Sequence, residues 1–272
     1  MNRTVTRGLT LIELLVGMAL LGIILSALTS FFVQSSKTSV QSSVRAELQQ
    51  ETLNAQQLIT GKLKEAFYIY PPGSSINKLT ETALTRNPIT SNNNWNITST
   101  AANNHPMLAM ILPPRNPGLT CAVNPDGCYR FVAYYPVKRS DWLSGTAATA
   151  DSFRNPGADP SNDSSTWVLA EYRRVMSSAF DPSSYPFATP PAVPTGATAN
   201  LLSDYIAPTT ASGTTYTMFT YTTGGTPATV TSVTINLAAT RNSAGKTLRQ
   251  PGATGAYSIS VTPTNLGKIA SN

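Results

Sequence analysis

Charge is scarce in this chain. Asp, Glu, Lys and Arg make up 12% of its 272 residues, about half the share of an ordinary soluble domain. Beyond the N-terminus the chain is rich in uncharged Ser, Thr, Asn, Pro and Gly, a composition that suits exposed, loop-rich extracellular surfaces. The formal net charge is +6, yet the basic residues form no tract. The sequence therefore gives no footprint of specific nucleic-acid recognition, although it permits attraction to nucleic acid or anionic lipid.

The groups that usually carry catalysis are few. His105 is the only histidine and lies in a polar loop, where we expect it to be solvated, so no histidine-based metal cluster can form. The chain has no P-loop, no GxSxG elbow and no CxxC pair. We predict no enzyme, no cofactor and no metal site, while catalysis by scattered carboxylates stays open. Six aspartates lie near Gly, Pro, Ser or Asn, where turn or cap roles are expected: Asp126, Asp141, Asp151, Asp159, Asp163 and Asp181.

Cysteine is limited to Cys121 and Cys128, which have six residues between them in the segment CAVNPDGC. Pro125, Asp126 and Gly127 favour a turn there. We predict a disulfide that closes this small loop, which requires an oxidising compartment outside the cytoplasm. Two unrelated free thiols are the alternative.

One long apolar run lies near the N-terminus. The short basic segment MNRTVTRG is followed by LTLIELLVGMALLGIILSALTSFFV, in which Leu14 to Val33 are twenty consecutive uncharged residues. A helix of that length crosses a hydrocarbon layer of about 30 Å. Arg3 and Arg7 place its N-terminus in the cytoplasm, so we predict that everything after about residue 35 is exported.

Glu13 separates this segment from simpler export or membrane signals. An ordinary signal peptide has an apolar region of about 7–15 residues and a small-residue cleavage site behind it, whereas the run here is longer. A simple signal anchor or a buried core helix has no need of a carboxylate inside the run. Because an unpaired ionisable group costs on the order of 2–3 kcal/mol near the bilayer centre, the position of Glu13 points to a function.

The segment RGLTLIELLVGMALLG resembles the class III signal of type IV prepilins and type II secretion pseudopilins. The resemblance implies that a peptidase cuts between Gly8 and Leu9 and that the new N-terminus of Leu9 is methylated. Cleavage would remove Arg3 and Arg7 and lower the net charge from +6 to +4. Glu13 becomes the fifth mature residue, where the family's glutamate pairs with the N-terminal amine of a neighbouring subunit. The family usually has Phe where this chain has Leu9, an apolar replacement that should keep cleavage.

The same resemblance implies a location and a set of partners. It predicts a single-pass inner-membrane protein whose head lies outside the cytoplasm and which later enters a filament at the cell surface or in the periplasm. The expected partners are the prepilin peptidase and methylase, other pilin or pseudopilin subunits, and an inner-membrane assembly platform. DNA is a further possible partner of the head.

The residues after the membrane segment predict an α+β fold. No proline occurs before Pro71, and apolar residues recur at three, four or seven positions: Val40, Val44, Leu48, Ala55, Leu58, Ile59, Leu63 and Ala66. With the resemblance, this predicts the type IV pilin fold, a long N-terminal helix packed on an antiparallel β-sheet head with long loops. We divide the chain into a leader at 1–8, a transmembrane and filament-core helix at 9–33, an amphipathic helix of the head at 34–70 and a β-rich head at 71–272.

Six later runs have the composition of strands: 107–112, 129–137, 166–175, 214–222, 232–241 and 256–262. In SVTINL and YSISV, apolar residues alternate with polar ones, the period-two pattern of a sheet with one buried face. The Asn- and Thr-rich segment 74–106 has little periodicity. We expect a long solvated loop there, with a contact surface for another subunit as the alternative.

The order of these segments resembles one subgroup, the J-type minor pseudopilins and the W-type minor pilins. The cues are CYRFVAYYPV, WVLAEYRR, SVTINLAATR and YSISVTPTNLG. This predicts a minor subunit in the filament or at its tip, with pilus biogenesis, type II secretion and DNA uptake all open. A second hypothesis is a DNA-uptake or adhesin subunit whose head contacts a polymer through Lys138, Arg139, Arg173 and Arg174. A membrane-anchored enzyme is a third.

Processing at Gly8 predicts a defined mass change. The mature protein should lack residues 1–8 and carry one added methyl group on Leu9. Intact-mass measurement of protein purified from cells with and without the processing peptidase checks this expectation. A chain of unchanged length in cells that contain the peptidase would contradict it.

Overall fold

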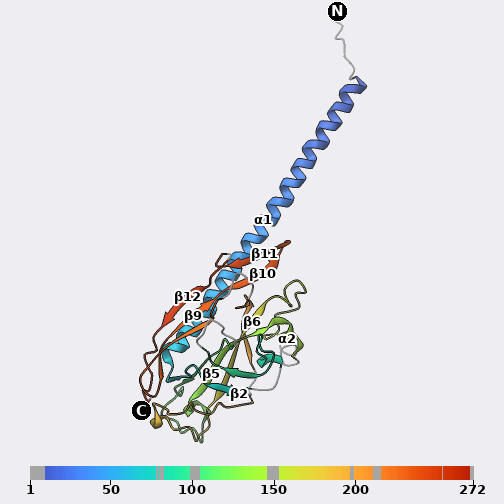
Figure 1. Ribbon diagram of the computed structural model, residues 1–272. Coiled ribbons are helices and arrows are strands. Elements are labelled where there is room, and N and C mark those ends of the chain that lie inside the picture. The colour runs from blue at the N-terminus through green and yellow to red at the C-terminus, as the bar shows by residue number, and fades with distance from the viewer. Residues whose placement is uncertain are drawn as a thin grey trace, which may run out of the picture. The chain divides into compact units, whose positions relative to one another are not determined.

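The computed structural model describes residues 10–77, 79, 83–98, 105–145, 153–196, 199–210, 216–252 and 254–269. The chain divides into two compact units, residues 1–44 and residues 45–272, and each is described by itself. The first described helix, α1 (Leu11–Glu65), contributes residues to both units and is drawn in blue in Figure 1.

Helix α1 ends where its backbone begins to pair with a strand. Two lysines in its last turn, Lys62 and Lys64, complement the negative end of the helix dipole. The amide of Phe67 then donates to the carbonyl of Ile111 at 2.9 Å, and the next residues form β1 (Tyr68–Ile69). The backbone groups that follow the helix pair with a strand before the chain reaches its first proline, Pro71. The helix therefore ends at Glu65, five residues before the predicted boundary at 70.

The part of α1 within the second unit buries one narrow stripe. Leu48, Thr52, Ala55, Ile59 and Leu63 follow one another at intervals of three or four residues, and all are buried. The predicted stripe is therefore largely present, with Thr52 as an added member. Val40 and Leu58 were wrongly included, since they are 46% and 57% exposed.

The head is built from antiparallel strands in three sheets (Figure 1). A seven-stranded sheet has the order β1-β4-β5-β6-β7-β10-β11, a three-stranded sheet has the order β12-β9-β8, and β2 pairs with β3. The strands after β1 are β2 (Ser75–Asn77), β3 (Asn94–Asn96), β4 (Leu108–Leu112), β5 (Arg130–Lys138), β6 (Trp167–Val175), β7 (Asn200–Ile206), β8 (Phe219–Gly224), β9 (Thr229–Leu237), β10 (Ala239–Ser243), β11 (Lys246–Gln250) and β12 (Tyr257–Val261). The predicted α+β class is confirmed.

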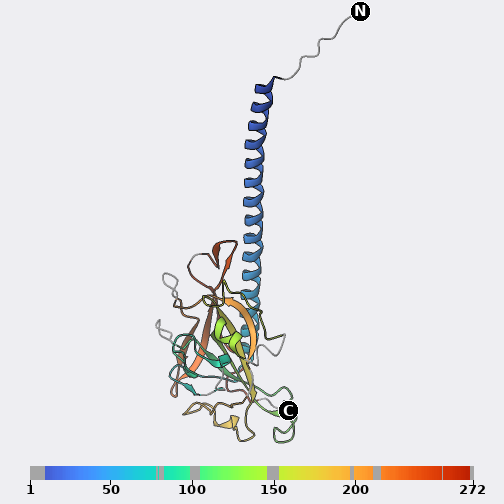
Figure 2. The same cartoon turned by 90° about the vertical axis from the view of Figure 1, so that its right-hand side faces the viewer.

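Short helices connect some of these strands. Helix α2 (Arg139–Ser144) follows β5 directly and packs beside β5 and β6, where it appears as the short light-green helix in Figure 2. Three single 3₁₀ turns also occur in the head: η1 (Ala83–Thr85), η2 (Pro125–Gly127) and η3 (Pro182–Ser184). The sequence patterns predicted a turn at the position of η2 but none of the other three elements.

The run 232–241 forms two strands rather than one. Residues up to Leu237 belong to β9 in the three-stranded sheet, and residues from Ala239 belong to β10 in the seven-stranded sheet. The buried Ala238 lies between them, and its carbonyl accepts from the amide of Ala207 at 2.8 Å. The chain therefore passes from one sheet to the other without a loop, which a continuous period-two pattern cannot reveal.

The alternating segments differ in how well they predict burial. In β9, alternate apolar residues ending at Leu237 are fully buried, as the pattern indicates. In β12, Val261 is buried, but Ile259 is 38% exposed. Because β12 is an edge strand of a three-stranded sheet, part of its apolar face lacks a covering element.

Segment 74–106 is not the solvated loop that its composition indicates. Within the described part, β2 and β3 pair, and Ile76, Leu84, Trp95 and Ile97 are buried in the core of the head. The indole N–H of Trp95 donates to the carbonyl of Thr85 at 3.0 Å. With the buried Leu79, five apolar side chains thus anchor a polar segment without any periodic pattern.

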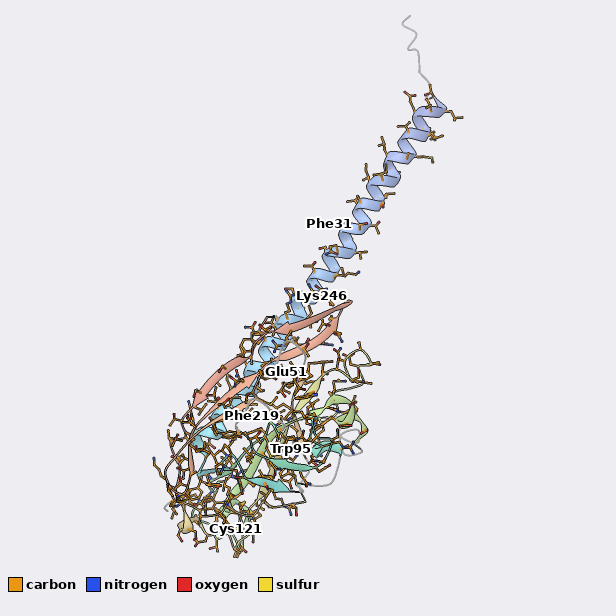
Figure 3. The ribbon with its side chains drawn as sticks, viewed as in Figure 1. Phe31, Glu51, Trp95, Cys121, Phe219 and Lys246 are labelled. Atoms are coloured by element: carbon orange, nitrogen blue, oxygen red, sulfur yellow. A yellow bond between two sulfur atoms is a disulfide. The ribbon has the colours of Figure 1, made fainter. Side chains whose placement is uncertain are left out.

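A buried ion pair joins α2 to the sheet. Arg139, which is 0% exposed, donates from Nε to the Asp204 carboxylate at 2.9 Å and also pairs with Asp163. Its Nη2 donates to the carbonyl of Gly157 at 2.7 Å. The amide of Asp204 in turn donates to the carboxylate of Glu51 on α1 at 2.6 Å (Figure 3 labels Glu51). This cluster therefore links the helix, α2 and β7 within the head.

Removal of the buried guanidinium should destabilise the head. Arg139→Met leaves two carboxylates without their cation, and such losses cost about 3–5 kcal/mol. The neighbouring Lys138→Met removes the same charge from a half-buried position and should change the free energy of unfolding by less than about 0.5 kcal/mol. Denaturant unfolding of the full chain in detergent, followed by the fluorescence of its three buried tryptophans, measures both. Equal losses would show that Arg139 is not the central cation.

Glu51 should make stability depend on pH. Burial raises the pKa of Glu51 above its ordinary value, and the nearby Asp204 carboxylate adds to the rise, although the Asp204 amide opposes it. A raised pKa means that the stability contributed by the protonated form is present at acid pH and is lost as pH rises through the folded-state pKa. Glu51→Gln should therefore match the wild type near pH 4 and become the more stable protein towards pH 7. Unfolding curves across that range test this, and a constant difference would contradict it.

Candidate functional site

The N-terminal part of α1 carries an apolar surface on every side. Each described residue from Thr10 to Val40 is exposed, and the large apolar side chains from Leu11 to Val33 are 48–84% exposed. Figure 3 shows these side chains along the helix, with Phe31 labelled. Soluble proteins rarely expose contiguous apolar patches larger than a few hundred Å². This segment therefore needs an apolar environment, either lipid or other helices.

The length of the helix and the hydrogen bonding of its hydroxyl groups within the helix suit it to span a membrane. It is the one described helix that is long and apolar enough to cross a bilayer, and none of its apolar window is buried within the chain. The hydroxyl of Thr29 donates to the carbonyl of Leu25 at 2.8 Å, so this polar group is satisfied inside the helix. An apolar helix with internally satisfied hydroxyls fits single-pass membrane anchoring.

Glu13 and Thr10 form a capping box at the start of α1. The amide and the hydroxyl of Thr10 each donate to the Glu13 carboxylate at 2.9 Å. The amide of Glu13 donates back to the Thr10 hydroxyl at 3.3 Å. The spacing Thr-x-x-Glu is the sequence signature of this motif, so the role of Thr10 was available from the sequence and was missed. Gly8 and Leu9 lie outside the described residues.

A disulfide joins Cys121 and Cys128 and closes the turn between them. The Asn124 side chain caps η2 by accepting from the amide of Asp126 at 2.9 Å. Gly127 approaches the backbone so closely that a Cβ there would lie 2.2 Å from the carbonyl oxygen of Leu119. The loop thus has a fixed conformation, and Figure 3 labels Cys121 within it.

The four cations considered for polymer contact do not form one site. Arg139 is fully buried in its ion pairs, so its assignment to the surface was wrong. Lys138 and Arg130 lie at opposite ends of β5. Arg130 pairs with Val175, at the end of β6 that carries Arg173 and Arg174. Only Arg173 and Arg174 line the same groove. Three cations that are distant from them in the sequence, Lys62, Arg115 and Arg130, also line it.

His105 is not a solvated loop side chain. It is half-buried, its Nδ1 lies 3.0 Å from the Asn87 side-chain nitrogen, and its ring lies beside Trp95. Burial lowers the pKa of His105, which favours the neutral ring at neutral pH. His105 therefore belongs to the packing of the segment around Trp95.

The loop aspartates serve local structure wherever the chain is described. Asp181 caps η3 by accepting from the amide of Ser183 at 2.9 Å, Asp141 pairs with Arg86, and Asp163 pairs with Arg139. Asp151 lies outside the described residues. Among the residues that the structure describes, no three His, Cys, Asp or Glu side chains gather in a way that could hold a metal ion.

Comparison with known families identifies the N-terminal segment alone. Residues 3–29 match the model of the prokaryotic N-terminal methylation motif, and the match includes Gly8, Leu9, Thr10 and Glu13. No curated protein and no solved structure matches the chain. The motif indicates a prepilin substrate of the type IV pilin or pseudopilin kind, which implies processing by a prepilin peptidase and assembly with other such subunits.

Proposed function

We propose that the chain is a minor type IV pilin or pseudopilin, cleaved between Gly8 and Leu9, methylated on Leu9, and assembled into an extracytoplasmic filament or at its tip. The observation that carries the proposal is the methylation motif at residues 3–29. It coincides with a helix whose apolar side chains are exposed all round in the single chain. Pilus biogenesis, type II secretion and DNA uptake would all use such a subunit.

Apolar packing alone does not explain why the helix would leave the bilayer. Lipid tails are as apolar as leucine side chains, so transfer from lipid to a helical filament core changes the hydrophobic free energy little. The carboxylate of Glu13 is different, because a charge near hydrocarbon is costly until it is paired. Pairing of Glu13 with the N-terminal amine of a neighbouring subunit would supply a free-energy gain specific to the assembled state.

The capping box suggests where that pairing occurs. Glu13 accepts two hydrogen bonds from Thr10, which hold the carboxylate at the first turn of α1. Cleavage after Gly8 would create an amine on Leu9, one residue before Thr10. A carboxylate oxygen can accept more than one hydrogen bond, so the box can persist while a neighbour's amine binds the same group.

The assignment to a minor subunit rests on the head. Residues 45–272 form one compact unit, which is large for a subunit that repeats along a filament. The segments that resemble the J-type and W-type subgroup lie mainly in β5, β6, β9, β10 and β12. Because the family match ends at residue 29, this subgroup rests on those segments alone.

Paired substitutions separate charge pairing from helix capping. Glu13→Gln keeps an oxygen that can accept from Thr10 but removes the charge, whereas Thr10→Val keeps the carboxylate and removes the hydroxyl. We expect Glu13→Gln to lower incorporation into filaments about tenfold or more, because it cannot pair with an amine as an ion. Thr10→Val should stay within about twofold of the wild type. The fraction of the protein in sheared filaments, relative to the membrane, measures the effect.

Intact mass of each variant controls for processing. Both variants should lose residues 1–8, so that a difference in filaments reports assembly alone. Normal incorporation of Glu13→Gln would refute charge pairing. Loss of incorporation with Thr10→Val but not with Glu13→Gln would instead assign the segment's function to helix capping.

A further inference from the structure

A basic groove lies on the head beside the disulfide-closed loop. Its cavity has a volume of about 500 Å³. Its charged lining residues are five cations and one carboxylate, and its apolar lining comes from Leu112, Pro125, Val132 and Val175. The charged residues are Lys62, Arg115, Asp126, Arg130, Arg173 and Arg174. They come from α1, from the loop after β4 and from β5 and β6, so only the fold brings them together.

The floor of the groove alternates charge and apolar surface. Arg130 on β5 lies opposite Val175 on β6, and Val132 lies opposite Arg173. Directly opposed residues of an antiparallel pair share one face of the sheet, as do alternate residues along a strand. The four side chains therefore form a checkerboard, in which each arginine has a valine beside it in both directions.

The guanidinium of Arg130 is held in a fixed position. Its Nε and Nη2 donate to the carbonyl of Pro113 at 3.2 and 3.1 Å, and the other N–H groups of its fork can bind a carboxylate. Burial lowers the pKa of Arg130, and the neighbouring cation Arg115 lowers it further. Positive charge is thus concentrated at this point, and an anion would relieve the repulsion.

The carboxylates of the head neutralise the groove only in part. Arg173 is paired with Glu171 at 2.6 Å and Lys62 with Glu65 at 3.6 Å. Arg115 lies 3.7 Å from Asp126, but both side chains are more than half exposed, and such pairs contribute about 0–1 kcal/mol. An incoming carboxylate can therefore replace the contact between Arg115 and Asp126 at little cost, while Arg173 keeps its buried partner Glu171 and can bind a second carboxylate.

We propose that this groove binds an acidic peptide segment of another protein, in which carboxylates flank an apolar side chain. The arginines would take the carboxylates, and the apolar side chain would lie against the exposed Val175, above the buried Leu112 and Val132. The proposal does not depend on the role of the chain in a filament, since the groove lies wholly within residues 45–272.

The lining favours a peptide over a nucleic acid. Grooves that bind single strands pair their cations with aromatic side chains on which the bases stack, at about 1–3 kcal/mol per base. None of the described residues that line the groove is aromatic. Its floor offers aliphatic side chains instead, which suit an aliphatic side chain of a peptide.

A binding assay on the full chain in a neutral detergent tests the proposal. The probe is a fluorescein-labelled peptide, Glu-Glu-Leu-Glu-Glu, and its binding is followed by fluorescence anisotropy at low and at moderate salt. The comparison probes replace Leu by Ser, replace every Glu by Lys, or are a labelled oligothymidylate. Arg115→Glu with Arg173→Glu reverses two exposed charges of the groove. Lys246→Glu with Lys268→Glu makes the same change in net charge at exposed positions outside the lining.

The acidic peptide should bind the wild type and the Lys246 and Lys268 variant alike, and should bind the Arg115 and Arg173 variant at least tenfold more weakly. The Ser peptide should bind about tenfold more weakly than the Leu peptide, since it lacks the apolar side chain that would be removed from water on binding. Equal losses in both double variants would overturn the proposal in favour of nonspecific attraction. Tighter binding of the oligothymidylate through the same arginines would overturn it in favour of a nucleic acid, and no binding of the acidic peptide at low salt would also refute it.

Discussion

The exposed apolar surface of α1 between Leu11 and Val33 is the constraint on which the rest of the molecule depends. Water cannot solvate that surface without a large free-energy cost, so the segment requires a bilayer or other helices. Either environment is costly for Glu13, whose carboxylate is bound by Thr10 in the single chain. A helix that is apolar except for one carboxylate is suited to move from a bilayer into contact with other helices.

The head meets a different requirement, because it must fold in water around the end of the same helix. A stripe from Leu48 to Leu63 supplies the apolar contact. Gln56 adds two hydrogen bonds, to the carbonyls of Ile235 and Tyr257 at 3.0 and 2.7 Å. Glu51 accepts from the Asp204 amide, next to the buried Arg139. The helix thus has apolar and hydrogen-bonded attachments to the sheets, and the buried Gln56 and half-buried Glu51 side chains both have partners there.

The basic groove and the disulfide-closed loop are connected through local geometry. The loop after β4 carries Arg115 and Asp126, and the bond between Cys121 and Cys128 limits the conformations that this loop can adopt. A wall that is held in place presents its charges to a ligand at a smaller entropic cost than a mobile one. The disulfide-closed loop therefore forms one wall of the basic groove and also holds that wall in place.

Sequence alone determined the features that are encoded by near neighbours along the chain. The uncharged run from Leu14, the position of Glu13, the two cysteines and most of the strands can all be read from patterns within about ten residues. Only the tertiary structure decided that Arg139 is buried, that β9 continues into a second sheet at Ala238, and that Trp95 fixes a polar segment in the core. The groove belongs with these, because Lys62, Arg130 and Arg173 meet only through strand register and helix packing. Contacts between residues far apart in sequence leave no local periodicity, and that is the physical reason they could not be predicted.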